Sequence, residues 1–396
     1  MEITVRPGDS YWYYSQLFDV PLILIQDSNP QINPDQLFPG RQIQIPGYEV
    51  LQYTITANDS LWSIAMNQNL PIDSLFLLNQ MVDPMALPVG SQLFIPRRIN
   101  ELVISDINGY TYEKMSRDIE RLVNIYPFIA AGSAGSSVMG KQMTELRVGD
   151  GPRNVHINGS FHANEWITTP VIIRFLNEYA RALTNSLPLR GLFMLPSYMD
   201  YTLSTVPMVN PDGVNLVING ASSAGDFQRE VLQINNGNDD FSNWKANIHG
   251  VDLNNQFPAL WEIESERKPS VPQPRDFPGF SPLSEPESIA MAELANRRDF
   301  LRVIAFHTQG EVIFWGFEGI EPPESESIAE EFARTSGYTS IQYVDSYAGY
   351  KDWFIQKFRR PGFTIELGRG INPLPLEQFA EIYEESLGIM LANLYL

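Results

Sequence analysis

Hydrophobic and polar positions divide the chain into two stretches, with a boundary near Pro96-Arg97-Arg98. In the first stretch, apolar residues at alternate positions, such as Ile3 and Val5, precede short apolar runs with helical spacing. This pattern predicts small units with the order strand, helix, helix, strand. From Leu102 onward the apolar runs are longer, and Gly, Asn and Pro separate them, which is typical of a larger domain.

The first stretch contains an internal repeat in which six kinds of position recur after 50 residues without any shift of spacing. The pairs are Asp9 and Asp59, Ser10 and Ser60, Trp12 and Trp62, Pro21 and Pro71, Asn29 and Asn79, and Gly40 and Gly90. In each copy we expect the Asp to cap a first helix that carries the Trp, and the Pro to begin a second helix. We expect most of the Trp, Leu and Ile positions to form the core of each unit.

The order of these residues resembles that of the LysM domain. The first copy closes on Gly40 and Ile45-Pro46, and the second closes on Gly90 and Ile95-Pro96, at the positions where the family has them. The resemblance implies two small βααβ modules, at residues 1–47 and 50–97. It also implies that they bind glycans containing N-acetylglucosamine, chiefly peptidoglycan and chitin.

In the second stretch, short apolar runs alternate with segments of helical periodicity. The runs typical of buried strands are Asn154–Ile157, Leu301–Phe306 and Phe363–Ile365. Helical periodicity marks Thr168–Leu183 and Glu285–Phe300. The alternation predicts an α/β domain with a largely parallel sheet. Residues 269–286 contain six prolines and are expected to form a loop.

Composition excludes several classes of function. The chain has 27 basic and 47 acidic residues, a formal charge of −20, which does not suit binding to nucleic acid. It has no Cys, which excludes disulfides, thiolate nucleophiles and Cys-ligated zinc. No apolar run reaches about 18 residues, so we expect no membrane span. The first residues show no signal-peptide pattern. The oligomeric state stays open.

Two of the four histidines have sequence neighbours that are typical of structural residues. His156 alternates with apolar neighbours in an expected strand, and His249 precedes Gly250 in a turn, without an acidic residue at ligand spacing. We expect both to be structural. The other two, His162 and His307, each follow an expected buried strand and need a separate explanation.

Ligands for a metal ion are expected where the buried strands end. His162 and Glu165 are three residues apart between an expected strand and an expected helix, and His307 and Glu366 each end an apolar run. Functional groups of open α/β sheets gather at the carboxyl ends of strands. His162, Glu165 and His307 form the ligand set of a catalytic zinc with one open position, so we expect one Zn²⁺ per chain. Glu366 is then the expected general base.

Five segments in this order resemble the zinc carboxypeptidase family of metallopeptidases. They are His162-Ala163-Asn164-Glu165, Asn210-Pro211-Asp212-Gly213, Gly250-Val251-Asp252-Leu253-Asn254, Ser284-Glu285-Pro286-Glu287 and Phe363-Thr364-Ile365-Glu366-Leu367. The resemblance implies that residues 102–396 form an α/β/α sandwich around a mixed, mostly parallel sheet. It gives His162, Glu165 and His307 the role of zinc ligands and Glu366 that of general base.

The segment after Gly250 departs from the family where exopeptidases bind the substrate's terminal carboxylate. Members of that kind have an Arg that holds this carboxylate, whereas Asn255 stands there in this chain, and Asn254 keeps the second contact. An amide cannot form the bidentate ion pair that Arg makes. Lys351 lies near the position that selects the substrate side chain, which favours a substrate with an additional carboxylate, unless Lys351 is a solvated loop residue.

Two further roles have several candidates. The cation that stabilises the oxyanion is expected to be Lys245, which follows Trp244, although Arg229 is also near in sequence. The Tyr that caps the family's site is expected to be Tyr347, with Tyr343 and Tyr350 as competitors.

Taken together, LysM units and a zinc peptidase without the carboxylate clamp resemble peptidoglycan endopeptidases of this family. The resemblance implies hydrolysis of the γ-D-Glu–diaminopimelate bond of bacterial stem peptides. Because the first residues show no signal-peptide pattern, we expect the protein in the cytoplasm of the sporulating cell or at the spore wall. Three alternatives remain: an ordinary carboxypeptidase that uses Arg369 or Lys351 as its clamp, a deacylase of small amides, and an inactive wall-binding protein.

Overall fold

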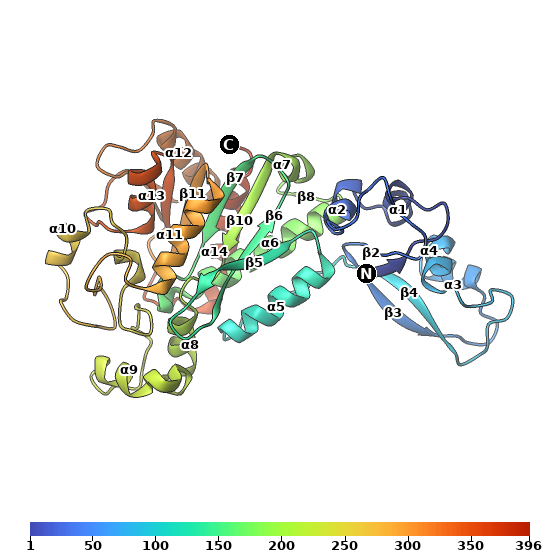
Figure 1. The fold of residues 1–396 in the computed structure, drawn as a ribbon, viewed down its shortest axis with the longest axis horizontal. Coiled ribbons are helices and arrows are strands. Elements are labelled where there is room, and N and C mark those ends of the chain that lie inside the picture. Colours follow the sequence, from blue (N-terminus) through green and yellow to red (C-terminus); the bar gives the residue numbers. More distant parts are fainter. The chain divides into compact units, whose positions relative to one another are not determined.

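The computed structural model of the protein describes residues 1–396, which form two compact units (Figure 1). The first unit comprises Met1–Ser105, Ile119–Ala130 and Leu176–Pro196, and the second comprises Asp106–Asp118, Ala131–Phe175 and Ser197–Leu396. No helix is both long enough and apolar enough to cross a lipid bilayer.

Both halves of the repeat fold as βααβ modules, as predicted. The first module consists of β1 (Glu2–Thr4), α1 (Tyr11–Phe18), α2 (Leu22–Asp27) and β2 (Gln42–Gln44). The second consists of β3 (Tyr48–Thr54), α3 (Leu61–Asn67), α4 (Ile72–Leu78) and β4 (Gln92–Arg98). In each module the opening and closing strands pair antiparallel.

The caps of the first helices differ from the prediction. Ser10 and Ser60, not Asp9 and Asp59, hold the cap position, and each serine hydroxyl accepts a hydrogen bond from the backbone amide three residues later. The aspartates lie one residue too early to cap. Asp9 instead pairs with Arg6, whose Nε lies 2.9 Å from its Oδ2, and Asp59 accepts a hydrogen bond from the backbone amide three residues before it.

The expectation of a core position was wrong for both tryptophans. Trp12 and Trp62 are each 64% exposed. In α1 the buried side chains are those of Tyr11, Tyr14, Ser15 and Phe18, which lie on one face of the helix, and Trp12 lies outside that face. The equal exposure of the two tryptophans follows from their equal place in the repeat.

Side chains of the first module bind the second. Arg6 contacts Asp73 as well as Asp9, with 2.6 Å between its Nη2 and Asp73 Oδ2. The hydroxyl of Tyr13 also donates a hydrogen bond to Asp73. The two modules are therefore joined by a network of charged hydrogen bonds as well as by the chain.

An eight-stranded sheet forms the centre of the second unit, in the order β13-β12-β14-β11-β7-β10-β6-β5 (Figure 1). The strands are β5 (Ala130–Ser136), β6 (Gln142–Val148), β7 (Arg153–Asn158), β10 (Tyr201–Val206), β11 (Arg302–His307), β12 (Val312–Phe314), β13 (Thr339–Ile341) and β14 (Gly362–Glu366). Neighbours are parallel from β10 through β7 and β11 to β14, and also between β12 and β13. The β6–β10 and β12–β14 pairs are antiparallel, so the sheet is mixed and mostly parallel, as predicted.

The longer helices of the second stretch include both predicted ones. They are α5 (Tyr112–Ile125), α6 (Thr168–Thr184), α8 (Pro211–Asn219), α11 (Pro286–Arg298), α12 (Glu324–Ser336), α13 (Tyr350–Phe358) and α14 (Phe379–Ala392). Shorter elements are β8 (Pro188–Leu189), β9 (Leu192–Phe193), α7 (Leu195–Asp200), α9 (Gln228–Ile234) and α10 (Trp261–Glu266). The proline-rich segment is a loop that ends where α11 begins.

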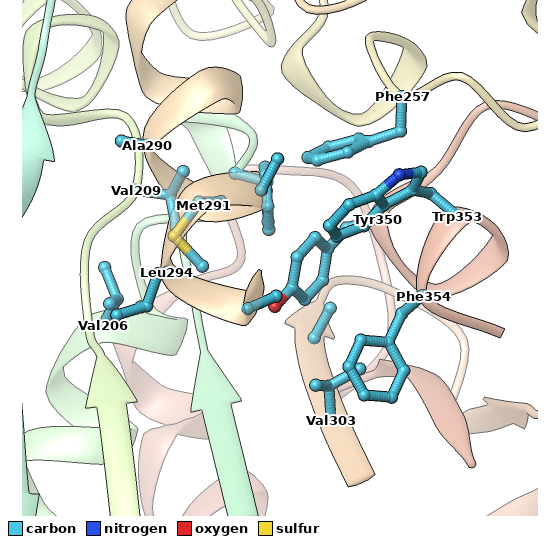
Figure 2. Packing of buried hydrophobic residues seen from close by; sticks show 14 of the residues in the cluster. Val206, Val209, Phe257, Ala290, Met291, Leu294, Val303, Tyr350, Trp353 and Phe354 are labelled. Atoms are coloured by element: carbon cyan, nitrogen blue, oxygen red, sulfur yellow. The ribbon is translucent and has the colours of Figure 1, made fainter. Parts of the chain in front are cut away.

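A hydrophobic core fixes α11 and α13 against the sheet (Figure 2). Met291 of α11 and Tyr350 and Trp353 of α13 are buried together with Val303 of β11. Burial of each such side chain contributes roughly 1.5–3 kcal/mol. All six residues of β11 are buried, as expected for a central strand covered on both faces. The carboxyl end of β11 therefore has a fixed position.

The two histidines expected to be structural are packed or hydrogen-bonded in the fold. His156 stacks on Phe300 and lies 3.2 Å from the Ser204 hydroxyl. His249 lies 2.8 Å from a carboxylate oxygen of Glu285, an acidic partner 36 residues away that sequence spacing did not reveal.

Buried carboxyl groups meet at the start of α11. Asn247 donates hydrogen bonds to Glu285 and Glu287, over 2.8 Å and 3.3 Å. Burial, together with the nearby charges of Asp212 and Glu285, raises the pKa of Glu287 to about 7. The hydrogen bond to Glu285 raises the pKa of His249.

Candidate metal centre

Three adjacent parallel strands end at the candidate metal centre. His162 follows β7 by four residues, His307 is the last residue of β11, and Glu366 is the last residue of β14. His307 and Glu366 lie side by side in the register of the β11–β14 pair. Glu165 ends a 3₁₀ turn that begins after His162, and its amide donates to the His162 carbonyl over 3.2 Å. This tight turn brings the His162 and Glu165 side chains together.

The three predicted ligands converge on one point. Nδ1 of His162 and Nδ1 of His307 are 3.1 Å apart, and they lie 2.9 Å and 3.0 Å from the two carboxylate oxygens of Glu165. All three side chains are buried, and one ligand atom from each lies within 4.8 Å of the others. Two imidazole nitrogens and one carboxylate in this arrangement fit a zinc ion that keeps one position for water.

Asp252 orients His162 through the ring nitrogen that does not face the other ligands. Its Oδ1 lies 3.1 Å from Nε2 of His162, the ring nitrogen that faces away from Glu165. The Asp252 amide donates to the Phe277 carbonyl over 2.7 Å, which fixes the backbone of the carboxylate. A carboxylate that holds the second nitrogen of a ligand histidine is common at zinc sites. Sequence analysis included Asp252 in a family segment but gave it no role.

Mutual charge governs the protonation of the cluster. Burial opposes the charged form of Glu165, but His162 and His307 keep its pKa well below the ordinary range. Burial also opposes the charged form of His162, yet Glu165 and Asp252 raise its pKa to about 8. Burial lowers the pKa of His307. Glu366 differs from Glu165, because burial and the charge of Glu165 raise its pKa to about 8.

Two neighbouring cavities share lining residues at this site, and we call them the wide lobe and the narrow lobe of one cleft. The wide lobe has a volume of about 400 Å³ and the narrow lobe about 160 Å³. Both lobes are lined by His162, Lys245, Phe314 and Glu366. A substrate that occupies both lobes would therefore present its central bond to the candidate metal and base. A larger cavity elsewhere, of about 690 Å³, contains none of the predicted ligands.

The narrow lobe contains the predicted substrate residues Asn254, Asn255 and Lys351. Asn254 accepts a hydrogen bond from the Tyr350 amide through its side-chain oxygen over 3.1 Å. Lys351 is not a solvated loop residue. Its buried ammonium lies 2.6 Å from Asp352 and also donates to the Gly316 carbonyl over 2.6 Å. Lys268, which sequence analysis missed, also lines this lobe.

The structure separates the two candidates for the oxyanion cation. Lys245 lines both lobes, and its Nζ lies 3.2 Å from Asp252. Burial opposes its charge, but Asp252 and Glu165 raise the pKa of Lys245. Arg229 lines the separate large cavity. The geometry therefore favours Lys245 over Arg229.

Tyr347 lies outside both lobes in this structure. It lines a neighbouring cavity of about 490 Å³ together with Tyr343, and the guanidinium of Arg267 lies 5.0 Å from its ring centre. Tyr350, the third candidate, is fully buried in the core. A capping role for Tyr347 stays a prediction, and it requires the segment that carries Tyr347 to move.

Comparison with known proteins agrees with these observations. The zinc carboxypeptidase family matches residues 115–388, and the LysM domain matches residues 3–46 and 53–96. The chain is 54% identical over 396 residues to gamma-D-glutamyl-L-diamino acid endopeptidase 1 of Lysinibacillus sphaericus, and the match covers 100% of both chains.

Solved structures with low sequence identity share the fold. Bovine thrombin-activatable fibrinolysis inhibitor, solved with tick carboxypeptidase inhibitor, has a TM-score of 0.54 at 19% identity, over 74% of this chain and 96% of its own. Carboxypeptidase A from Helicoverpa armigera has a TM-score of 0.53 at 17% identity, over 88% of this chain and 98% of its own.

Proposed function

The chain belongs to the zinc carboxypeptidase family and carries two LysM domains, and from this premise we propose that it hydrolyses the γ-D-Glu–diaminopimelate bond of bacterial peptidoglycan stem peptides. The full-length relative from Lysinibacillus sphaericus bears the name of a γ-D-glutamyl-L-diamino acid endopeptidase. We further propose one Zn²⁺ per chain, bound by His162, Glu165 and His307.

The choice of substrate rests on the residues that line the narrow lobe. The narrow lobe presents the Asn255 amide where a terminal carboxylate would need a guanidinium, and it also contains Lys268 and Lys351. Diaminopimelate has two carboxylates, and D-Glu linked through its γ-carboxyl keeps a free α-carboxylate. A lobe without the clamp but with lysines suits such a substrate better than it suits a plain carboxyl terminus.

The chain's own residues supply the remaining chemistry of hydrolysis. Zinc, when bound, polarises the scissile carbonyl and lowers the pKa of a water molecule. Glu366, at the junction of the lobes, takes the proton of the attacking water and delivers it to the departing nitrogen. Lys245 places positive charge where the carbonyl oxygen becomes negative. Asp252 keeps His162 oriented throughout.

The LysM domains are proposed to hold the enzyme on glycan that contains N-acetylglucosamine. Trp12 and Trp62 present exposed indole rings at the same place in each module, and aromatic faces suit the apolar faces of sugar rings. Wall binding is consistent with action on stem peptides, which are attached to that glycan. We propose the spore wall as the site of action, which immunodetection of the protein in purified spores would test.

An ordinary carboxypeptidase would need a different clamp, and neither candidate is suitably placed. Arg369 is exposed, pairs with Glu311 and lines neither lobe. The ammonium of Lys351 is held by Asp352 and the Gly316 carbonyl, so it adds positive charge to the narrow lobe but cannot form the two parallel hydrogen bonds of a guanidinium clamp. A deacylase of small amides would not need two glycan modules, and an inactive protein would not need the complete set of His162, Glu165, His307 and Glu366.

The deciding experiment is an assay on L-Ala-γ-D-Glu-diaminopimelate, with and without a terminal D-Ala, read by mass spectrometry. We expect release of L-Ala-D-Glu, loss of turnover on chelation and recovery with zinc. Cleavage only of substrates with a free terminal carboxylate, and none of their amidated forms, would instead establish a carboxypeptidase. A zinc-loaded protein that cleaves neither tripeptide nor tetrapeptide would contradict the proposed substrate.

A further inference from the structure

The wide lobe contains a guanidinium, that of Arg275, which the mechanism above does not use. We propose that Arg275 binds the free α-carboxylate of the γ-linked D-Glu residue, on the acyl side of the scissile bond. The enzyme would therefore select stem peptides in which this carboxylate is not amidated. The inference rests on the proposed function and specifies which feature of its substrate is recognised.

The proline-rich loop holds Arg275 firmly beside the metal centre. Just before it, the Pro274 carbonyl accepts a hydrogen bond from the Lys245 amide over 2.8 Å. Two residues after it, the Phe277 carbonyl accepts one from the Asp252 amide over 2.7 Å. The segment with Arg275 is thus tied on both sides to the chain that carries the oxyanion cation and the carboxylate behind His162. A loop of this kind positions a side chain as a regular element would.

The charge of Arg275 is available to a ligand. Its side chain is exposed at the wall of the lobe, and its Nε lies 3.3 Å from Oδ2 of the adjacent Asp276. That neighbour also lies 3.8 Å from Lys245 and 4.0 Å from Lys268, so its charge is shared among three cations. A guanidinium can pair with a carboxylate through two parallel hydrogen bonds, which gives it selectivity for that group.

The distribution of cations between the lobes indicates which part of the substrate each lobe receives. Diaminopimelate, the departing part, has two carboxylates, and the narrow lobe contains Lys268 and Lys351. The acyl part has one free carboxylate, which the Cα, Cβ and Cγ atoms of D-Glu separate from the reacting carbonyl, and the wide lobe contains Arg275. Lys245 is common to both lobes, as its proposed role at the reacting carbonyl requires. Matching of charge therefore assigns the D-Glu residue to the wide lobe.

The test compares two substrates and two enzymes in a thermodynamic cycle. The substrates are L-Ala-γ-D-Glu-diaminopimelate and its analogue in which the D-Glu α-carboxylate is an amide. For the wild-type enzyme we expect kcat/KM to favour the free acid about 5- to 30-fold, the range for a charged hydrogen bond at a partly exposed site. In Arg275→Gln we expect this preference to fall to about twofold or less, with little change for the amide.

Two variants and a binding measurement isolate the role of the charge. Arg275→Lys should keep part of the preference, and Arg297→Gln, an exposed position on α11, should keep all of it. In a Glu366→Gln background, calorimetry should show that L-Ala-D-Glu binds more weakly when Arg275 is also changed to Gln. The product with an amidated α-carboxylate should bind the two proteins equally.

The outcomes separate this inference from the proposed function. Wild-type cleavage of both substrates at equal rates, or an unchanged preference in Arg275→Gln, would overturn the role of Arg275 and leave the proposed function in place. Failure of the wild-type enzyme to cleave either substrate would overturn both.

Discussion

Two glutamates that line the same lobe as His162 have opposite electrostatic environments. Glu165 faces two imidazoles that stabilise its charge, whereas burial and the charge of Glu165 raise the pKa of Glu366 to about 8. A carboxylate of the first kind suits a metal ligand, and one of the second kind suits a group that must hold and release a proton. The contrast supports the different roles proposed for them.

Substitution of the base should separate metal binding from turnover. Glu366→Gln removes the proton acceptor but leaves His162, Glu165 and His307 unchanged, so we expect about one zinc per chain and a loss in kcat of about 10³-fold. Metal analysis and the tripeptide assay on the same sample measure both quantities. Turnover within tenfold of the wild type would exclude Glu366 as the base.

Substitution of Asp252, which contacts the outer ring nitrogen of the ligand His162, should lower the affinity for zinc. Asp252→Asn weakens the hydrogen bond that orients His162, and we expect zinc affinity to fall about 10- to 100-fold. Competition with a chelator of known affinity measures this loss. Asp276→Asn is the matched control, because Asp276 also lies near Lys245 but does not contact His162. An equal loss in the control would mean that Lys245, not His162, transmits the effect.

Sequence reasoning was most informative for site residues that end buried strands. The strand pattern pointed to His307 and Glu366, and the structure places them side by side. It could not assign a role to Asp252 or Arg275. Asp252 reaches His162 across 90 residues, and Arg275 depends on two backbone hydrogen bonds of an irregular loop. Neither contact leaves a periodic signal.

At the scale of elements, the buried carboxyl group of Glu287 near the start of α11 should make the stability of the fold depend on pH. Glu287 has a pKa of about 7 in the fold against about 4.5 in the unfolded chain. The folded state therefore binds this proton more tightly, so the contribution of Glu287 to stability is fully present below pH 4.5 and is lost as pH rises through 7. One buried group with this shift accounts for a loss of up to about 3 kcal/mol.

Glu287→Gln should reduce this dependence, because its amide oxygen can still accept the hydrogen bond from the Val138 amide. We expect the free energy of unfolding of the variant to decline less between pH 5 and 8 than that of the wild type. Urea unfolding of the two full-length proteins, followed by near-ultraviolet circular dichroism, measures the difference. Parallel pH profiles would show that Glu287 is ionised in the fold throughout this range.

Elements were predictable where burial imposes a period. The central strands β7, β11 and β14 and the helices α6 and α11 were found because their apolar residues form continuous runs or helical stripes. The three-residue strands β12 and β13 and the Gly- and Ser-containing β5 carry no such pattern. The same period, applied to α1, would have placed Trp12 outside the face that carries Tyr11 and Tyr14.

At the scale of the whole molecule, wall binding and peptide hydrolysis should be separable. Trp12→Ala combined with Trp62→Ala removes both exposed indoles without removing a core side chain, so we expect a normal rate on the soluble tripeptide. On insoluble peptidoglycan we expect hydrolysis to fall about tenfold, in parallel with the fraction of protein that sediments with the wall. Replacement of Met81, which is 98% exposed, is the matched control. Equal losses on both substrates would place the tryptophans in folding rather than in binding.

The bridge from Arg6 to Asp73 gives the two modules a fixed spacing. When the tryptophan of one module binds a glycan strand, the second tryptophan is held at a set distance along that strand. The effective concentration of the second module therefore does not depend on a flexible linker. Such a pair gains avidity only from glycan long enough to reach both modules. The enzyme should consequently be retained by long strands, released as they are shortened, and nearly indifferent to free disaccharide.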